Sequence, residues 1–238
     1  MFHIVRAIPG APIHLNPSAE LADRVLLPGD PQRALTMAQA LLSEPRMFNT
    51  RRGLWGYTGT AADGGPVTIQ ATGMGGPSAA IVVEELIGLG ARTLIRTGTC
   101  GAIDPSLELG QLVTASETIP ADGASRALGA AGTVAADPEL SDALVRAGGG
   151  RAMKAVSSDL FYDPRPGQED EWRRQGAAMV EMEAAAVLTV AGRHGARAGC
   201  LLLVSDVLGG DGPRRLSDAE LEAAGERLGA VALAALAG

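Results

Sequence analysis

The chain has 238 residues, a size at which α/β proteins commonly form one domain around a single large core. Hydrophobic residues make up 46% of it and charged residues 20%, which is ordinary for a globular protein and excludes a disordered or fibrous one. The net charge is -7 and there is no run of basic residues, so we expect no nucleic acid and no anionic membrane surface as a partner.

Other simple features narrow the class of protein further. The two cysteines, Cys100 and Cys200, have no metal-ligand spacing and predict buried, reduced thiols. The segment Met1–Pro12 lacks the charged-then-apolar pattern of a signal peptide. No apolar run approaches the roughly 20 residues that a membrane helix needs. We therefore expect a cytoplasmic protein with no metal site.

Apolar runs and turn signals predict strands that alternate with helices. In chain order, the predicted strands are Arg24–Leu27, Trp55–Ala61, Val67–Thr72, Thr93–Thr97, Leu112–Glu117, Ala152–Ser157, Ala178–Val180 and Gly199–Val204. The predicted helices are one that opens at Asp30-Pro31, then Ser78–Leu89, Pro138–Ala147, Glu183–His194 and a last one from Ser217, with a capping box to Glu220. This alternation favours one α/β domain over residues 1–238, with a parallel or mixed sheet and helices on both faces.

The first predicted strand turns into its helix at Gly29–Arg33. Open α/β sheets bind ligands at such strand ends. A glycine at a helix N-terminus exposes backbone N–H groups to an anion, and Arg33 adds a bidentate guanidinium one turn later. From these residues alone, a plain strand–helix turn with a surface arginine is the more common interpretation.

A second turn, Gly73–Ser78, nearly matches the dinucleotide-binding pattern Gly-x-Gly-x-x-Gly. Ser78 replaces the last glycine, Pro77 interrupts the pattern, and the next strand ends in Arg96 rather than in an acidic residue. We therefore reject this turn as a dinucleotide site, and a dehydrogenase stays only as a rival that failure to bind a nicotinamide cofactor would exclude.

A third turn is predicted at Gly98–Gly101, after the strand that carries Arg96. An arginine at the end of an apolar strand needs an anionic partner, which is either a bound anion or a structural carboxylate. Thr99 offers a hydroxyl and a backbone N–H to the same anion. Both interpretations of Arg96 remain open at this point.

Two acidic positions also follow predicted strands. Glu181-Met182-Glu183 opens a helix, where a carboxylate either complements the helix dipole or binds a ligand. Asp206 follows Gly199–Val204 and is either a proton donor or the cap of the next turn. The chain has no P-loop and no Gly-x-Ser-x-Gly motif, so these segments taken singly name no reaction.

Together, and in this order, the segments resemble the nucleoside phosphorylase I family, in particular its hexameric bacterial purine nucleoside phosphorylases. The matching stretches are His14–Asn16, Pro28–Ala34, Arg52–Gly59, Gly73–Leu86, Arg96–Ala102, Ser158–Tyr162, Val180–Ala184 and Ser205–Asp206. The resemblance implies a mixed, twisted and partly barrel-like sheet flanked by helices. It also implies reversible phosphorolysis of purine ribo- and deoxyribonucleosides, as in purine salvage.

The resemblance implies a role for each matching position. Phosphate would be held by Gly29, Arg33, Arg96 and Thr99, together with Arg52 of a neighbouring subunit. The ribose would be held by Met74, Met182, Glu183 and the neighbour's His14. The base would contact Cys100, Gly101, Phe161, Val180 and Glu181, and Asp206 would be the catalytic acid at purine N7. The family needs no cofactor, because inorganic phosphate is a co-substrate, and it implies a homo-oligomer with shared sites, a hexamer built as a trimer of dimers.

The chain departs from its family near the predicted acid. Val204 and Leu208 predict an apolar setting, which would keep Asp206 protonated and able to donate. Bacterial relatives carry an arginine in the last helix that assists this aspartate, whereas Glu220 or Leu221 falls near that position here. Arg214 and Arg215 lie in the preceding loop, Gly209–Arg215, and the sequence does not decide whether either one takes its place.

Several alternatives stay open. A uridine phosphorylase is suggested by Gly167-Gln168-Glu169, which is similar to the uracil-reading phrase of those enzymes, but Asp206 favours purine. A methylthioadenosine phosphorylase is suggested by the Gly-Gly-Pro-Ser form at Gly75–Ser78. A hydrolytic nucleosidase would not need Arg33, Arg52 and Arg96. An alternative of a different class is a nucleoside-binding protein without activity. The presence of the full set of Arg33, Arg96, Glu183 and Asp206 argues against it.

Overall fold

A computed structural model describes residues 12–208 and 214–237. Its strands are β1 (Arg24–Pro28), β2 (Ser43–Asn49), β3 (Gly56–Thr60), β4 (Pro66–Gln70), β5 (Thr93–Ala102), β6 (Leu112–Ala121), β7 (Val134–Ala135), β8 (Ala152–Ser158), β9 (Met179–Glu181), β10 (Arg197–Val207) and β11 (Arg214–Arg215). Its helices are α1 (Pro31–Leu41), α2 (Gly76–Leu89), α3 (Gly123–Ala127), α4 (Pro138–Arg146), α5 (Gln168–Arg174), α6 (Ala184–Arg193) and α7 (Asp218–Ala237), with a short 3-10 helix, η1, at Arg51–Gly53.

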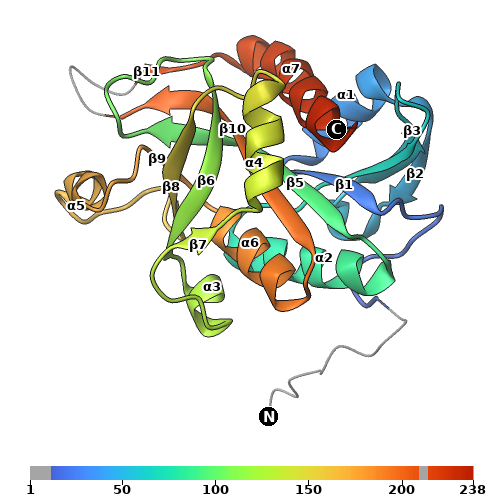
Figure 1. Ribbon diagram of the computed structural model, residues 1–238, viewed down its shortest axis with the longest axis horizontal. Helices are drawn as coiled ribbons and strands as arrows, with labels where there is room; N and C mark the ends of the chain where they lie inside the picture. Colours follow the sequence, from blue (N-terminus) through green and yellow to red (C-terminus); the bar gives the residue numbers. More distant parts are fainter. Residues whose placement is uncertain (1–11, 209–213, 238) are drawn as a thin grey trace.

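The strands form one mixed sheet, part of which closes on itself. Strands β10, β6, β8, β9 and β5 each pair with the next, and β5 pairs back with β10. From β5 the sheet continues as an open arm in the order β1, β4, β3, β2. The predicted α/β fold, with a mixed and partly barrel-like sheet, is confirmed (Figure 1).

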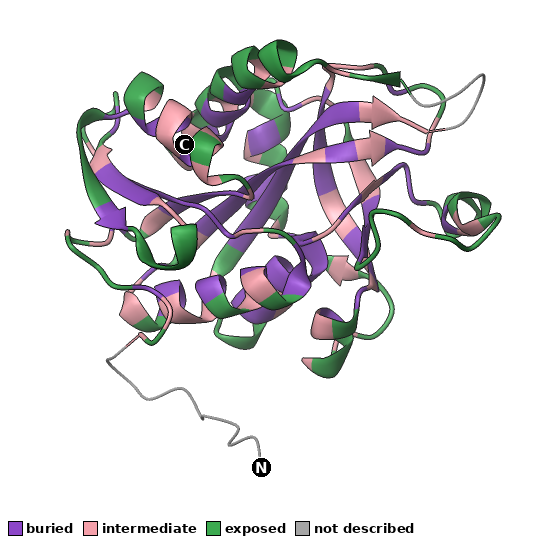
Figure 2. Ribbon diagram, turned by 180° about the vertical axis from the view of Figure 1, so that it is seen from behind, coloured by how far each residue is buried: buried purple, intermediate pink, exposed green. Residues whose placement is uncertain are grey.

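Helices cover the sheet on both faces, as predicted. Helices α1, α4 and α7 lie on one face and α2 and α6 on the other (Figure 1). Strand β1 shows why both faces need cover, because Leu26 belongs to the first core while Val25 and Leu27 belong to the second. The central strands β1, β5 and β10 are accordingly buried along most of their length (Figure 2).

Local sequence signals set several boundaries. The Asp30 carboxylate accepts a hydrogen bond from the Gln32 N–H at 2.8 Å, and Pro31 occupies the first turn of α1, so the predicted start of this helix is confirmed. The predicted capping box is also present, because the Glu220 carboxylate accepts from the Ser217 N–H and hydroxyl, both at 2.7 Å.

The structure corrects the prediction of a turn at Gly98–Gly101. Strand β5 runs without a break to Ala102, because Gly98 to Ala102 pair with β10 and the last two of these residues also pair with β9. Strand β10 likewise extends beyond Val204 to Val207. The glycines suggested a turn, but long-range pairing holds this stretch extended.

Other elements were missed by the sequence patterns. Strand β2 is mostly exposed and contains Pro45, so it lacks the alternation that marks a strand. Helix α5 is short and charged, and it lies on an arm that projects from the body (Figure 1). Most of the predicted loop Gly209–Arg215 lies outside the described residues, and its last two residues form β11.

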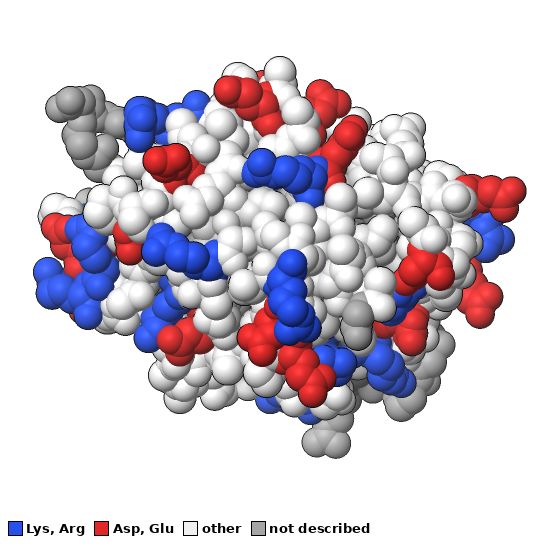
Figure 3. Space-filling view, turned by 45° about the horizontal axis from the view of Figure 1, so that its top comes forward, with Lys and Arg blue, Asp and Glu red and all other residues white. Residues whose placement is uncertain are grey.

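Two surface properties follow from the fold. None of the described helices is long and apolar enough to cross a membrane. Basic and acidic side chains are interspersed over the face drawn in Figure 3. Among the ion pairs of the described residues, Arg197 lies 3.0 Å from both Asp137 and Glu139.

Candidate active site

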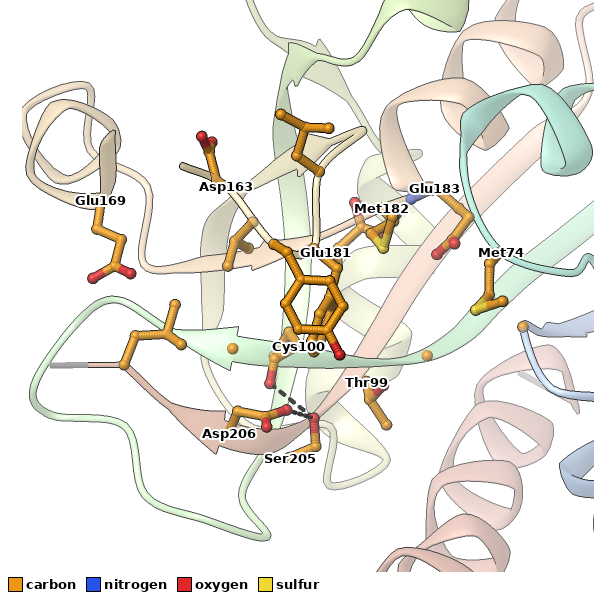
Figure 4. Close-up of a pocket in the computed structure, with 18 of the residues that line it drawn as sticks. Met74, Thr99, Cys100, Asp163, Glu169, Glu181, Met182, Glu183, Ser205 and Asp206 are labelled. Atoms are coloured by element: carbon orange, nitrogen blue, oxygen red, sulfur yellow. Dashed lines mark hydrogen bonds between the residues drawn. The ribbon is translucent and has the colours of Figure 1, made fainter. Parts of the chain in front are cut away.

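A cleft of about 1080 Å³ opens where β5, β9 and β10 end. It is lined by the predicted residues Gly29, Arg33, Met74, Arg96, Thr99, Cys100, Gly101, Phe161, Val180, Glu181, Met182, Glu183 and Asp206. These come from segments far apart in the chain, and the fold brings them together (Figure 4). His14 and Arg52 do not line this cleft.

One end of the cleft carries positive charge. Arg33 rises from the first turn of α1 and is half-buried. Burial lowers the pKa of Arg33, the Asp30 carboxylate opposes this shift, and the nearby Arg96 guanidinium adds to it. Two guanidinium groups close together in a partly buried site favour an anion as a shared partner.

Arg96 is 3% exposed and pairs with two carboxylates. Its Nε lies 2.8 Å from Glu181 Oε2, and its Nη2 lies 2.5 Å from Glu183 Oε2. Burial opposes the charge, but the two carboxylates outweigh burial and hold the pKa of Arg96 above its ordinary value. Its remaining nitrogen, Nη1, is buried and has no hydrogen-bond partner among the described residues. Arg96 therefore satisfies its structural carboxylates and keeps one donor group for an anion.

The geometry around Arg96 requires a glycine at position 98. A Cβ atom there would lie 2.6 Å from Arg96 Nη2 and 2.7 Å from its Cζ. Any larger residue would push the guanidinium out of its ion pairs. Gly98 is thus part of the site through its lack of a side chain.

Glu181 is a structural centre of the site. Its Oε2 accepts from the N–H groups of Glu183 and Ala184, each at 2.8 Å, and so caps α6. Its Oε1 accepts from the Ser157 hydroxyl. Glu181 also lines the cleft, where the resemblance implies contact with the base.

Glu183 faces the middle of the cleft. Its Oε1 accepts from the Gly75 N–H at 2.5 Å, and Gly75 holds a positive φ of 88° that favours glycine. Burial raises the pKa of Glu183, while the charge of Arg96 opposes that shift. Met182 and Met74 lie on either side of this carboxylate (Figure 4). A carboxylate between two thioethers can accept hydrogen bonds from the hydroxyls of a sugar. The ring of that sugar can contact the methionines at the same time.

Asp206 lies at the opposite wall, after a bulge between Val204 and Asp206. Its Oδ2 accepts from the Ser205 hydroxyl at 2.6 Å, and its Oδ1 lies 3.5 Å from Arg215 Nη1. Strand β11 places Arg215 directly opposite Asp206 in antiparallel register. The setting is therefore more polar than the apolar one predicted from Val204 and Leu208, because the bulge and β11 bring a hydroxyl and a guanidinium to the carboxylate.

The far end of the cleft suits a flat ring. Phe161 is 61% exposed and stands edge-on to Tyr162, with ring centroids 5.0 Å apart. Cys100 and Gly101 also line the cleft, and burial raises the pKa of the Cys100 thiol. Both cysteines are buried and free, as predicted. An aromatic edge, a neutral thiol and a glycine leave room for a planar apolar group.

His14 and Arg52 lie together on another part of the surface. Arg51 Nη1 donates to the Ile13 carbonyl at 2.9 Å, and the Asn16 N–H donates to Asn49 Oδ1 at 2.9 Å, so the two segments are bound side by side. Arg52 is exposed and has a φ of 58°, an uncommon backbone conformation for a residue other than glycine. These are the two residues for which the resemblance implies a role in a neighbouring subunit.

Comparison with known proteins agrees with this arrangement. Residues 23–237 match the Phosphorylase superfamily. The chain is 41% identical over 207 residues to the purine nucleoside phosphorylase DeoD-type of Jannaschia sp. (strain CCS1), a match that covers 82% of this chain and 87% of that relative. It is 40% identical over 197 residues to the protein of the same name in Geobacillus kaustophilus, covering 79% and 83%.

The chain belongs to the phosphorylase superfamily. The resemblance inferred from the ordered motifs is thereby confirmed. Within this superfamily fold, the cleft at the ends of β5, β9 and β10 is the place where the predicted residues gather.

The sequence predicted no role for several residues that line this cleft. Ser205 and Tyr162 line the cleft beside predicted residues, and Arg215 was left undecided. Tyr162 is 89% exposed, and its place in the matching stretch Ser158–Tyr162 was the available signal. Arg215 is identified by its register in β11, a long-range feature that no local pattern reports.

Proposed function

We propose that this protein is a pentosyltransferase that cleaves the N-glycosidic bond of purine nucleosides with inorganic phosphate. Its products are the free base and ribose 1-phosphate or deoxyribose 1-phosphate. The observation that carries the proposal is one cleft with Arg33 and Arg96 at one end, Glu183 in the middle and Asp206 on the far wall. The names of relatives that cover most of the chain support the same activity.

Phosphate binds at the positive end in this proposal. Arg33, the free Nη1 of Arg96 and the Thr99 hydroxyl supply donors, and Gly29 supplies backbone N–H at the start of α1. These groups orient one phosphate oxygen toward C1′ of the sugar, which contributes through positioning and through charge.

The sugar lies against Glu183 and the two methionines. As the bond from C1′ to the base nitrogen breaks, positive charge develops on the sugar ring. The phosphate dianion faces that charge and forms the new bond to C1′, while the Glu183 carboxylate accepts hydrogen bonds from the sugar hydroxyls. The bonding electrons leave with the base.

The base leaves toward Asp206. A purine accepts those electrons more easily if N7 takes up a proton, and Asp206 in its acid form donates it. The carboxylate that results is then stabilised by the Ser205 hydroxyl and by Arg215. Of the two arginines before the last helix, Arg215 is thus the one that we assign to assist Asp206.

Replacement of Arg215 tests this assignment. We expect Arg215→Gln to lower kcat about 10-fold, because the newly formed Asp206 carboxylate loses its cation, and to leave the KM for phosphate unchanged. Arg214→Gln is the matched control, since β11 pairs Arg214 with Val207 instead. Steady-state rates for both variants decide the matter, and equal effects of the two substitutions would contradict the assignment.

We further propose a homo-oligomer, a hexamer built as a trimer of dimers, in which His14 and Arg52 complete the cleft of a neighbouring subunit. Their placement side by side and away from the chain's own cleft supports this proposal. The enzyme needs no cofactor, since phosphate is a co-substrate, and it works in the cytoplasm.

A panel of nucleosides tests the proposed function. Inosine, guanosine, adenosine, methylthioadenosine and uridine are each incubated with and without phosphate, and the free base is measured. Phosphate-dependent release of a purine is the expected result. Release of uracil would favour the second candidate, a uridine phosphorylase. The position of Gln168 in the cleft wall supports that candidate. Release without phosphate would indicate a hydrolase.

A further inference from the structure

The side chain of Glu85, on α2, is bound by the segment that carries His14. Its Oε1 accepts from the N–H groups of Ile13 at 3.0 Å and His14 at 2.9 Å. Its Oε2 accepts from the Leu15 N–H at 2.7 Å. Three consecutive backbone donors therefore converge on one carboxylate, which is 14% exposed.

The same carboxylate contacts the imidazole ring of His14. His14 Nδ1 lies 2.7 Å from Glu85 Oε1. Burial opposes ionisation of Glu85, but the hydrogen bonds from Leu15, His14 and Ile13 outweigh it and hold the pKa of Glu85 below its usual range. An ionised carboxylate has no proton to give, so Nδ1 carries the hydrogen of this bond. In the neutral ring Nε2 is then left as an acceptor.

The rest of the segment is fixed just as firmly. Leu15 is buried in the same core as Phe48 and Leu86. The Ser18 N–H donates to the Phe48 carbonyl at 2.8 Å, and Arg51 holds the Ile13 carbonyl. The backbone of His14 is thus held between α2 and β2, and only its ring has a choice of hydrogen-bonding state.

We propose that Glu85 is a positioning residue that fixes both the backbone and the tautomer of His14, so that Nε2 accepts a hydrogen bond from the 5′-hydroxyl of a nucleoside in the neighbouring subunit's cleft. This inference rests on the proposed function. It assigns to Glu85 a part in recognition of the sugar, although Glu85 touches neither the substrate nor the cleft of its own chain.

Glu85→Gln is the sharpest test, because glutamine keeps the shape of the side chain but places an amide donor where an oxygen was. Its NH₂ group opposes one of the backbone N–H donors or donates to Nδ1 of His14, and the second arrangement turns Nε2 into a donor. The readout is kcat/KM for inosine relative to kcat/KM for 5′-deoxyinosine, which lacks the hydroxyl. We expect the substitution to lower this ratio about 10-fold, the size of one hydrogen bond to a polar group.

The chain offers a matched control on the same helix. Glu84 Oε1 lies 2.9 Å from Nε2 of His194, so Glu84→Gln also removes a carboxylate from a histidine, but from one outside the proposed site. We expect this variant to keep the wild-type ratio. Equal loss of activity toward both substrates in Glu85→Gln would mean that Glu85 only holds the fold together, and this result would overturn the proposal.

A second measurement does not depend on any variant being folded or active. The chain has only 3 histidines, so the side-chain nitrogen signals of His14 can be assigned by NMR in the wild-type protein. We expect the neutral ring of His14 to carry its proton on Nδ1, and a proton on Nε2 would overturn the proposal. If the wild-type protein cleaves no nucleoside, the proposed function fails, whereas this spectrum still reports on the contact between Glu85 and His14.

Discussion

Asp206→Asn should lower kcat for inosine phosphorolysis by about 10²–10⁴-fold, the usual contribution of a general acid. Asparagine keeps the hydrogen bond that Ser205 donates at 2.6 Å, so the geometry is retained while the transferable proton is lost. Steady-state kinetics with inosine and phosphate measure the effect.

The chemistry of the leaving group provides a control for this variant. In 7-methylinosine the base already carries a positive charge at N7 and needs no proton to leave. Asp206→Asn should therefore retain most of its activity toward 7-methylinosine. If both substrates lose activity equally, Asp206 acts by holding the cleft together rather than by donating a proton. If neither loses any, the account of Asp206 is wrong, because the proton for N7 then comes from another group.

Arg96→Met should lower the free energy of unfolding by about 3–5 kcal/mol, the usual cost of removing one partner from a buried ion pair. Arg96 faces Glu181 and Glu183, whose side chains are 0% and 6% exposed, and methionine leaves both carboxylates without a cation. For a chain of this length the loss corresponds to a fall in Tm of about 6–20 °C. Thermal unfolding followed by circular dichroism measures it.

The pH dependence of this variant has a definite sign. Burial already raises the pKa of Glu183, and Arg96 is the group that opposes this shift, so the substitution raises it further. A carboxyl whose folded pKa lies above its unfolded value loses stability as the pH rises through the folded pKa. The free energy of unfolding of Arg96→Met should therefore fall further below that of the wild type as the pH rises from 5 to 8.

Arg33→Met is the matched control for stability. Arg33 lines the same end of the cleft but forms no ion pair within 4 Å among the described residues. Its loss should raise the KM for phosphate and change Tm far less than the loss of Arg96. Equal destabilisation by the two substitutions would contradict the structural role assigned to Arg96.

Much of the site was predictable because the motifs sit at strand ends. Asp30, Pro31 and the glycine before them marked the start of α1, and with it the position of Arg33. The apolar run before Arg96 marked a buried strand, and an arginine in such a strand requires an anionic partner. Parallel pairing of β1 with β5 and of β5 with β10 then brings the ends of these strands to one edge.

What could not be predicted depends on long-range register. The glycines at 98 and 101 suggested a turn, and only pairing with β9 and β10 keeps them in a strand. Arg96 suits both partners that the sequence left open. Two of its nitrogens bind the structural carboxylates Glu181 and Glu183, and the third has no partner among the described residues and can serve an anion. Arg215 contacts Asp206, and Glu85 contacts His14. No sequence periodicity relates the two members of either pair. The partly closed barrel was expected from family resemblance, not from any local pattern.

The formation of sugar 1-phosphate tests the central claim most directly. The wild-type protein is incubated with inosine and inorganic phosphate, and hypoxanthine, remaining phosphate and ribose 1-phosphate are measured together. Our account predicts that one molecule of ribose 1-phosphate forms, and one phosphate disappears, for each hypoxanthine released. Release of hypoxanthine with free ribose and no loss of phosphate would contradict it, because the arginine end of the cleft would then have no part in the reaction.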